Sequence, residues 1–230
     1  MRGHLPERYS EDWRAPFDAR VRPALVAGTH ILDIGAGRRP TLPTGSRPPG
    51  CLYVGLDLAA AELEKAPPGS YDETYVADVA LRLPALEERF TLVVSWQVLE
   101  HVKSLDVAIE NLRSYLRPGG RLVAHMSGSF SLFATISRLV PHSLGAQAMQ
   151  HLLKRDRETV FPTHYDHCWY GALERMLASW SESQVLPRYR GAQYLSFCPV
   201  LQRVYLAFED WACLRGHRNL ATHYLVTAVR

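Results

Sequence analysis

The chain has 230 residues, of which 47% are hydrophobic and 21% are charged, a composition typical of a globular protein. Its formal net charge is only +3 and the basic residues are spread along the chain, which argues against a nucleic-acid partner. The sequence has no signal peptide, no apolar run of the roughly 18 residues that span a membrane, and no C-x-x-C pair among its four cysteines. We therefore expect a cytoplasmic protein with reduced thiols and a single α/β domain over residues 1–230.

The first 27 residues predict an N-terminal helical segment. Apolar side chains recur every four residues, as on one face of a helix. The residues with this spacing are Tyr9, Trp13, Phe17, Val21 and Leu25. Pro16 and Pro23 interrupt the pattern, so we expect a short helix, a break and another turn.

Between residues 30 and 126, short apolar strands alternate with helical patterns. A helix is predicted over residues 104–116, and Arg117-Pro118-Gly119-Gly120 ends it. This alternation is typical of a parallel sheet that helices cover on both faces. The predicted strands are residues 30–34, 52–56, 73–76, 90–95 and 121–126.

An insertion interrupts the alternation after residue 126. Residues 127–167 contain two short helical patterns, 130–139 and 143–153, and we expect them to form a helical lid above the carboxyl edge of the sheet, where ligands bind. The predicted fold is a doubly wound α/β domain with a mostly parallel seven-stranded sheet and this lid after strand five. The remaining predicted elements are helices over 169–180 and 200–214 and strands over 184–189 and 223–229.

The end of the first predicted strand carries the clearest ligand-binding motif. In Asp33-Ile34-Gly35-Ala36-Gly37, the two glycines allow the backbone to turn tightly and to approach a ligand without a Cβ in the way. About twenty residues later, Asp57 ends the second strand, where a carboxylate can accept hydrogen bonds from both hydroxyls of a ribose. Glycine loop and acid together predict a site for a ribose-containing cofactor.

With these motifs the sequence resembles the class I methyltransferases that use S-adenosylmethionine (SAM), especially the branch with L-E-H-V after strand four. The resemblance covers about residues 28–126 and implies a Rossmann-like fold with SAM as the cofactor. The matching segments are residues 31–37, 55–57, 77–79, 95–102 and 116–122.

The resemblance also implies roles for individual residues. The methionine part of SAM would face Asp33, Gly35, Ala36 and Gly37. The ribose would lie at Asp57 and Leu58, the adenine at Asp78 and Val79, and the border between the cofactor and the acceptor pocket at Ser95, Trp96 and Gln97.

The segment after the glycine loop departs from many members of this family. Where these members begin a helix, this chain has Arg38-Arg39-Pro40 followed by Pro43, Pro48 and Pro49, which a long regular helix cannot accommodate. A dinucleotide site depends on that helix to receive a pyrophosphate, whereas SAM has no pyrophosphate. The proline run therefore disfavours an NAD enzyme and is compatible with SAM.

Four side chains are candidates for a general base or for acceptor binding: His101, His125, His164 and Tyr165. Imidazole suits the first role because its ordinary pKa lies near neutrality. Each histidine could instead be a hydrogen-bonded structural residue, the interpretation that we favour for His125 and His164. We predict no metal site, because His164, His167 and Cys168 match no familiar zinc spacing.

Two aromatic patterns have structural and functional interpretations. Tyr9 and Trp13 could close over the sulfonium of SAM, or pack on the core as a helix face. The run in the helix over 200–214 could meet a membrane surface or a partner, but we expect it to be ordinary core. The residues of this run are Leu201, Val204, Tyr205, Phe208 and Trp211.

The predicted function is SAM-dependent methylation of a small molecule, at oxygen, in specialised or glycan-type biosynthesis. Two alternatives stay open at this point. The protein could use SAM itself as the substrate, cyclising its aminobutyrate arm to azetidine-2-carboxylate and releasing methylthioadenosine, or it could be a non-catalytic SAM-binding partner of another enzyme. The oligomeric state is not predicted.

Overall fold

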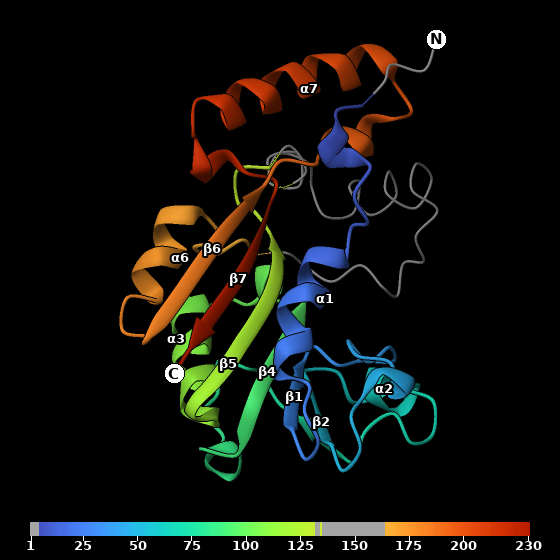
Figure 1. Cartoon of the computed structure of the whole chain (residues 1–230), viewed down its shortest axis with the longest axis vertical. Coiled ribbons are helices and arrows are strands. Elements are labelled where there is room, and N and C mark those ends of the chain that lie inside the picture. The colour runs from blue at the N-terminus through green and yellow to red at the C-terminus, as the bar shows by residue number, and fades with distance from the viewer. Residues whose placement is uncertain (1–4, 132–133, 135–163) are drawn as a thin grey trace.

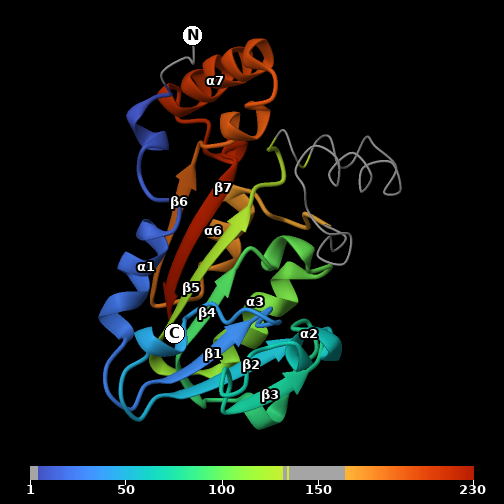
Figure 2. The ribbon, with the colours of Figure 1, turned by 90° about the vertical axis from the view of Figure 1, so that its right-hand side faces the viewer.

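The computed structural model describes residues 5–131, 134 and 164–230, and these residues form one seven-stranded sheet with helices on both faces (Figures 1 and 2). The strand order is β3-β2-β1-β4-β5-β7-β6, and β7 is antiparallel to both of its neighbours while the other pairs are parallel. The predicted doubly wound, mostly parallel sheet is thus confirmed. The strands are β1 (His30–Ile34), β2 (Leu52–Asp57), β3 (Glu73–Val76), β4 (Phe90–Trp96), β5 (Leu116–Ser127), β6 (Glu182–Arg188) and β7 (His223–Val229).

Helices of different lengths precede and connect these strands. Within the described residues, the α-helices are α1 (Ala15–Val21), α2 (Ala60–Glu64), α3 (Leu105–Tyr115), α6 (Tyr170–Met176) and α7 (Pro199–Leu214). Short 3₁₀ helices mark many of the turns between them. These are η1 (Glu7–Tyr9), η2 (Arg22–Ala24), η3 (Thr44–Ser46), η4 (Pro84–Leu86), η5 (Leu99–His101), η7 (Ala192–Leu195) and η8 (Arg218–Leu220).

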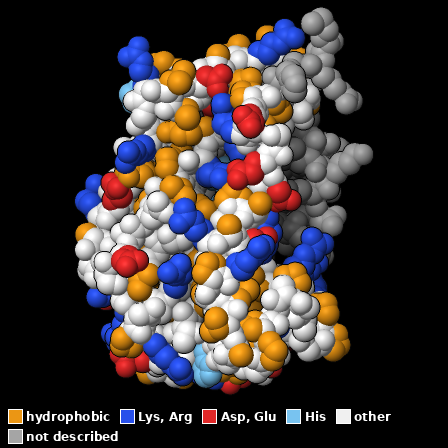
Figure 3. All heavy atoms as spheres, viewed as in Figure 1, with side chains coloured by type: hydrophobic (Ala, Val, Ile, Leu, Met, Phe, Trp, Pro, Cys, Tyr) orange, Lys and Arg blue, Asp and Glu red, His pale blue; other side chains and the backbone are white. Residues whose placement is uncertain are grey.

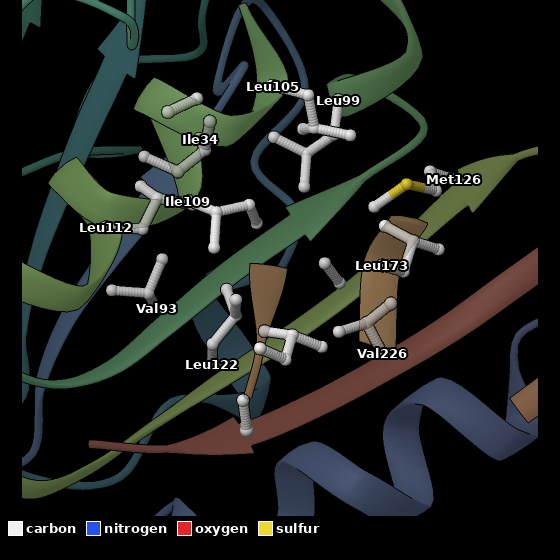
Figure 4. Close-up of a cluster of buried hydrophobic side chains, with 14 of the residues drawn as sticks. Ile34, Val93, Leu99, Leu105, Ile109, Leu112, Leu122, Met126, Leu173 and Val226 are labelled. Atoms are coloured by element: carbon white, nitrogen blue, oxygen red, sulfur yellow. The ribbon is translucent and has the colours of Figure 1, made fainter. Parts of the chain in front are cut away.

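The sheet separates two apolar layers, because successive side chains of a strand point to opposite faces. Helices α3 and α6 cover one face, where side chains from β4, β5 and β7 interdigitate with theirs (Figure 4). On the opposite face, Phe17 and Val21 of α1 pack against Ile31 of β1 and Val94 of β4. Burial on both faces explains why the parallel strands are nearly continuous apolar runs.

Strand β5 begins earlier than the predicted strand over residues 121–126. Phe90 pairs with Leu116 and Leu92 pairs with Arg121, so residues 117–120 bulge out between two paired positions. Gly119 has φ of +77°, a conformation that glycine adopts without strain. The Pro-Gly-Gly sequence therefore marks a bulge within the strand and not the turn before it.

The helical patterns of the predicted lid, residues 130–139 and 143–153, fall almost wholly outside the described residues. The described ends of this insertion lie together, because the Ser129 amide donates to the Cys168 carbonyl at 2.7 Å and Ser129 Oγ donates to the Tyr165 carbonyl at 2.9 Å. The insertion therefore leaves and rejoins the domain near the end of β5.

Helix α7 lies across the end of the sheet where β5 ends and β7 begins (Figures 1 and 2). The expectation that its aromatic and aliphatic run is core was wrong for most of that run: Tyr205 is buried, but Leu201, Val204, Phe208 and Trp211 are exposed. The helix is turned this way because Glu209, on its inner face, accepts hydrogen bonds from the Gly191 amide and from Thr222 Oγ1.

Charged side chains of both signs are interspersed over the face seen in Figure 3, without the single basic stripe that is typical of nucleic-acid grooves. None of the described helices combines the length and the apolar character that a membrane span needs.

Candidate functional site

The glycine loop follows β1 in the conformation that its residues favour. Gly35 and Gly37 have φ of +67° and +50°, and the amides of Gly35 and Ala36 donate to the Leu56 carbonyl at 2.8 and 3.2 Å. A Cβ on Gly35 would lie 2.2 Å from Val98 Cγ2, so a larger residue would not fit. The loop therefore runs close against the segment that leaves β4.

Asp33, buried in β1, anchors the segment that follows the glycine loop. Its Oδ2 accepts hydrogen bonds from the Thr41 amide at 2.7 Å and from Tyr53 Oη at 2.6 Å. Its Oδ1 is buried and has no hydrogen-bond partner. Burial raises the pKa of Asp33 to about 6. One oxygen thus fixes the protein backbone, and the other retains its capacity to accept a hydrogen bond.

The proline-containing segment between β1 and β2 forms no long helix; in this described stretch the structure shows only η3. Instead of helical hydrogen bonds, side-chain contacts fix this segment. Arg38 forms a bidentate ion pair with Glu62 at 2.6 Å, and Tyr71 Oη donates to the Ala36 carbonyl at 2.7 Å. The predicted departure from a helix after the glycine loop is confirmed.

Asp57 ends β2 directly beside the glycine loop. Its Oδ1 accepts a hydrogen bond from the Ala59 amide at 2.8 Å, and a Cβ on Gly37 would lie 3.5 Å from its Oδ2. Partial burial raises the pKa of Asp57, although nearby backbone amides oppose this shift. Leu58, the next residue, is 70% exposed. A half-buried carboxylate and a glycine thus lie together at the carboxyl edge of the sheet.

Asp78 and Val79 follow β3 at the same edge. Asp78 Oδ1 accepts a hydrogen bond from the Ala80 amide at 2.9 Å. Val79 is buried, and its carbonyl accepts a hydrogen bond from Asn111 Nδ2 of α3 at 3.0 Å. This hydrogen bond to α3 fixes the loop after β3 at the same sheet edge as Asp57.

The residues at the end of β4 have unusual surroundings. Ser95 is fully buried and its Oγ has no hydrogen-bond partner. Trp96 stacks on His125 with 4.4 Å between ring centroids. Gln97 has φ of +57°, and its amide donates to the His125 carbonyl at 2.7 Å. A left-handed residue other than glycine costs free energy and is frequent at ligand sites.

The candidate bases differ widely in environment. His101 lies in η5 and is half-buried, and His164 is exposed. Tyr165 is buried with φ of +50°. Burial, with the positive charges of Arg188 and Arg14, lowers the pKa of His125 to about 3. His125 is therefore neutral and weakly basic at neutral pH.

Glu100 connects β4 to both ends of the insertion. Its Oε1 accepts a hydrogen bond from the Ser127 amide at 3.2 Å, and its carbonyl accepts hydrogen bonds from the amides of His164 and Tyr165 at 3.1 and 2.9 Å. Burial raises the pKa of Glu100. The acidic residue of the Leu99-Glu100-His101-Val102 stretch thus has a positioning role in this structure.

Beside these residues the structure brings together a group that the sequence did not reveal as a group. Trp13 packs edge-on against His125 and His223, with centroid distances of 5.4 and 4.6 Å, and Arg190 lies 5.0 Å from the Trp13 ring. We call Trp13, Trp96, His125, Arg190 and His223 the edge cluster. Trp13 was predicted to contact SAM or the core, whereas Arg190 and His223 belong to no sequence motif.

A family model described as "Methyltransferase domain" matches residues 2–181 of the chain. Among curated proteins, the ubiquinone biosynthesis O-methyltransferase of Chelativorans sp. (strain BNC1) is 30% identical over 126 residues, which are 52% of this chain and 46% of that protein. The chain thus spans about half the length of the curated relatives it matches.

Solved structures share the fold at low sequence identity. The S-adenosylmethionine-dependent methyltransferase from Mesorhizobium loti matches with a TM-score of 0.54 and 19% identity, over 96% of this chain and 100% of that one. The Haemonchus contortus phosphoethanolamine N-methyltransferase 2, in complex with phosphomonomethylethanolamine and S-adenosylhomocysteine, matches with a TM-score of 0.56 and 15% identity, over 95% of this chain and 53% of that one.

Proposed function

The chain belongs to the methyltransferase domain family, and we propose that it is a SAM-dependent enzyme that methylates an oxygen of a small molecule. The family model matches more than half of the chain and confirms the predicted family. The observation that carries the proposal is that Gly37 lies beside Asp57. The glycine lets a ligand approach the backbone closely, and the carboxylate can accept hydrogen bonds from ribose hydroxyls.

The residues at the sheet edge fit SAM in several respects. A Cβ at Gly35 would collide with Val98, so the close approach of the backbone depends on glycine. Asp33 Oδ1 and Ser95 Oγ are buried without partners and could each accept a hydrogen bond from a bound ligand. Leu58 beside Asp57 offers exposed apolar surface to the cofactor.

We assign the proposed cofactor contacts as the resemblance implies. The glycine loop with Asp33 holds the methionine part, Asp57 with Leu58 holds the ribose, and Asp78 with Val79 borders the adenine. Ser95, Trp96 and Gln97 separate the cofactor from the acceptor. SAM supplies an activated methyl group on a sulfonium, so the protein has to align the acceptor with that group and exclude water.

His101 is the proposed general base among the predicted candidates. It lies in η5, the first helical turn after β4, and is partly accessible. His125 is the weaker choice, because a pKa of about 3 leaves little capacity to take a proton from a hydroxyl. Methylation at oxygen is supported by the names of the curated relatives, which are O-methyltransferases.

The proposal is tested by supplying purified protein with SAM that carries a labelled methyl group, with and without an extract of small metabolites. Methyl transfer produces S-adenosylhomocysteine and a labelled, oxygen-methylated product only when the extract is present. Release of methylthioadenosine from SAM alone would favour the cyclase alternative. Tight SAM binding without turnover in any extract would favour a non-catalytic partner.

A further inference from the structure

Arg190 is a buried cation without a counter-charge in ion-pair contact. It is only 4% exposed, and of its guanidinium nitrogens Nη2 donates to the Tyr9 carbonyl at 3.2 Å while Nε and Nη1 have no partner. Among the described residues no carboxylate lies within ion-pair distance of it. The neighbouring arginines are different, since Arg188 pairs with Glu11 at 2.6 Å and Arg8 pairs with Asp210 at 2.7 Å.

The contacts that Arg190 does make compensate only in part for its burial. Its guanidinium lies 5.0 Å from the Trp13 ring and 5.8 Å from the Tyr9 ring, distances at which an aromatic face attracts a cation. Such contacts are weaker than a charge-assisted hydrogen bond to an anion. Removing a guanidinium from water while leaving N–H groups unpaired is costly, so the site favours a negatively charged ligand.

The position of Arg190 connects it with the proposed transfer site. Trp13 lies between Arg190 and the two histidines of the edge cluster, and the charge of Arg190 contributes to lowering the pKa of His223. His125 in turn stacks on Trp96, which follows the cofactor-flanking Ser95. Arg190 is thus connected to the end of β4 through the packed rings of Trp13, His125 and Trp96.

The edge cluster offers further groups to such a ligand. His125 and His223 are buried and stack with 5.3 Å between their centroids, and Nδ1 of each has no hydrogen-bond partner. Both rings are neutral at neutral pH, because burial lowers their pKa values. Because His125 already stacks on both Trp96 and His223, what the cluster offers a ligand is the unpartnered Nδ1 atoms of the two imidazoles.

We propose that the methyl acceptor is a small anion, and that Arg190 binds its carboxylate or phosphate group beside the edge cluster. The inference rests on the proposed function, because it places the acceptor next to Trp96 at the border of the cofactor site. Arg190 acts here as a specificity-determining residue: it selects acidic acceptors and disfavours neutral ones of the same shape.

Direct binding tests the anion site without knowledge of the natural acceptor. Benzoate and phenyl phosphate are titrated against benzamide, which has the same ring and no charge, by calorimetry up to about 10 mM. We expect one or both anions to bind at least about tenfold more tightly than benzamide. Arg190→Gln should abolish this preference, and Arg190→Lys, which keeps the charge, should retain part of it.

Arg188→Gln is the matched control, because Arg188 lies two residues away on the same strand end and is already paired with Glu11. It should change anion affinity less than about threefold. Affinity for S-adenosylhomocysteine should be unchanged in both glutamine variants, which shows that each is folded. Equal binding of benzamide and the anions, no anion binding up to the highest concentration, or a preference that survives in Arg190→Gln would each overturn the inference.

Failure of this inference can be distinguished from failure of the proposed function. Methylation of a neutral acceptor at equal rates by the wild type and Arg190→Gln would overturn the anion site and support the methyltransferase. Selective anion binding through Arg190, without methyl transfer to any component of an extract, would support the anion site and contradict the methyltransferase.

Discussion

The two carboxylate oxygens of the buried Asp33 differ in their surroundings. Its Oδ2 fixes Thr41 and Tyr53, and its Oδ1 is left without a partner in the protein. An unpaired buried oxygen is costly to the fold alone, so it is expected where a ligand completes the hydrogen bonding. Because burial dominates the upward shift of its pKa, Asp33 destabilises the fold in its charged form.

Asp33→Asn should therefore stabilise the protein without cofactor, and increasingly so as the pH rises. The pKa of Asp33 is about 6 in the folded state, against an ordinary value of about 3.9, so the folded protein binds more protons between these values and loses stability as the pH rises through them. In urea unfolding, the free energy of unfolding of the variant relative to that of the wild type should increase by about 1 kcal/mol from pH 5 to pH 7. A gain that is the same at both pH values would contradict this account of Asp33.

His125 makes the opposite contribution to the dependence of stability on pH. Its folded pKa of about 3 lies below the ordinary value of about 6.5, so the unfolded chain takes up a proton that the folded protein excludes. Stability is then lost as the pH falls below about 6.5. His125→Gln should abolish about 1.4 kcal/mol of the loss between pH 7.5 and pH 5.5.

The control for this prediction is His217→Gln, because His217 is exposed and should leave the pH profile of unfolding unchanged. The prediction is wrong if the two variants show the same profile.

At the scale of elements, hydrogen bonds join η1 in the N-terminal segment to η7 and α7 near the C-terminus. Tyr9 of η1 donates a hydrogen bond to Glu209 of α7 and accepts one from the Ala192 amide at 3.1 Å. Glu209 is 1% exposed and depends on such donors. These contacts hold Trp13, which follows η1, over His125 and His223. The positions of α7 and η1 thus determine the shape of the edge cluster.

Tyr9→Phe should destabilise the fold by about 2 kcal/mol, because it removes a donor from a buried carboxylate without creating a large cavity. Chemical denaturation measures the change. Tyr170→Phe is the comparison, because Tyr170 Oη bonds to Glu174 at an exposed position, and it should cost less than about 0.5 kcal/mol. Similar losses for both variants would show that the Tyr9–Glu209 contact contributes little.

The elements near the cofactor could be predicted from sequence because each has a local signature. The first strand, the glycine loop and Asp57 are contiguous patterns, and buried parallel strands are apolar runs. The orientation of α7 could not be predicted, since both of its faces carry apolar residues and the buried Glu209 decides which one faces inward.

The edge cluster could not be predicted from the sequence either. Its residues come from the N-terminal segment, β4, β5, the turn after β6 and the start of β7. The register of the sheet brings Trp96, His125 and His223 together, and Trp13 and Arg190 pack onto them from outside the sheet. A single Arg190 or His223 in the sequence has no periodicity or spacing that marks it. The predicted cofactor residues lie at the expected edge, while their roles stay proposals.

In the whole molecule, the residues of the two proposed sites share the carboxyl edge of the sheet. The glycine loop, Asp57 and Asp78 lie at the ends of β1, β2 and β3, and the edge cluster lies at β4, β5 and β7. Reactants bound at these places would meet near Ser95 and Trp96 at the end of β4. Between β1 and β4 the order of the strands in the sheet reverses, with β2 and β3 on one side and β5 on the other. This location agrees with the general rule that open α/β sheets bind ligands beyond the carboxyl ends of their strands.

The predicted cytoplasmic location and the predicted helical lid over residues 127–167 stay predictions. The exposed apolar residues of α7 are a separate feature of this end of the molecule, next to the edge cluster and not part of it.

The central claim is that the glycine loop and Asp57 bind SAM for methyl transfer. Calorimetric titration of SAM into the wild type, Asp57→Ala and Glu64→Gln tests it most directly, because Glu64 is an exposed acid on the adjacent helix α2. We predict saturable one-to-one binding to the wild type and to Glu64→Gln, and a loss of at least about tenfold in affinity for Asp57→Ala. Binding of SAM to Asp57→Ala with wild-type affinity would contradict the claim.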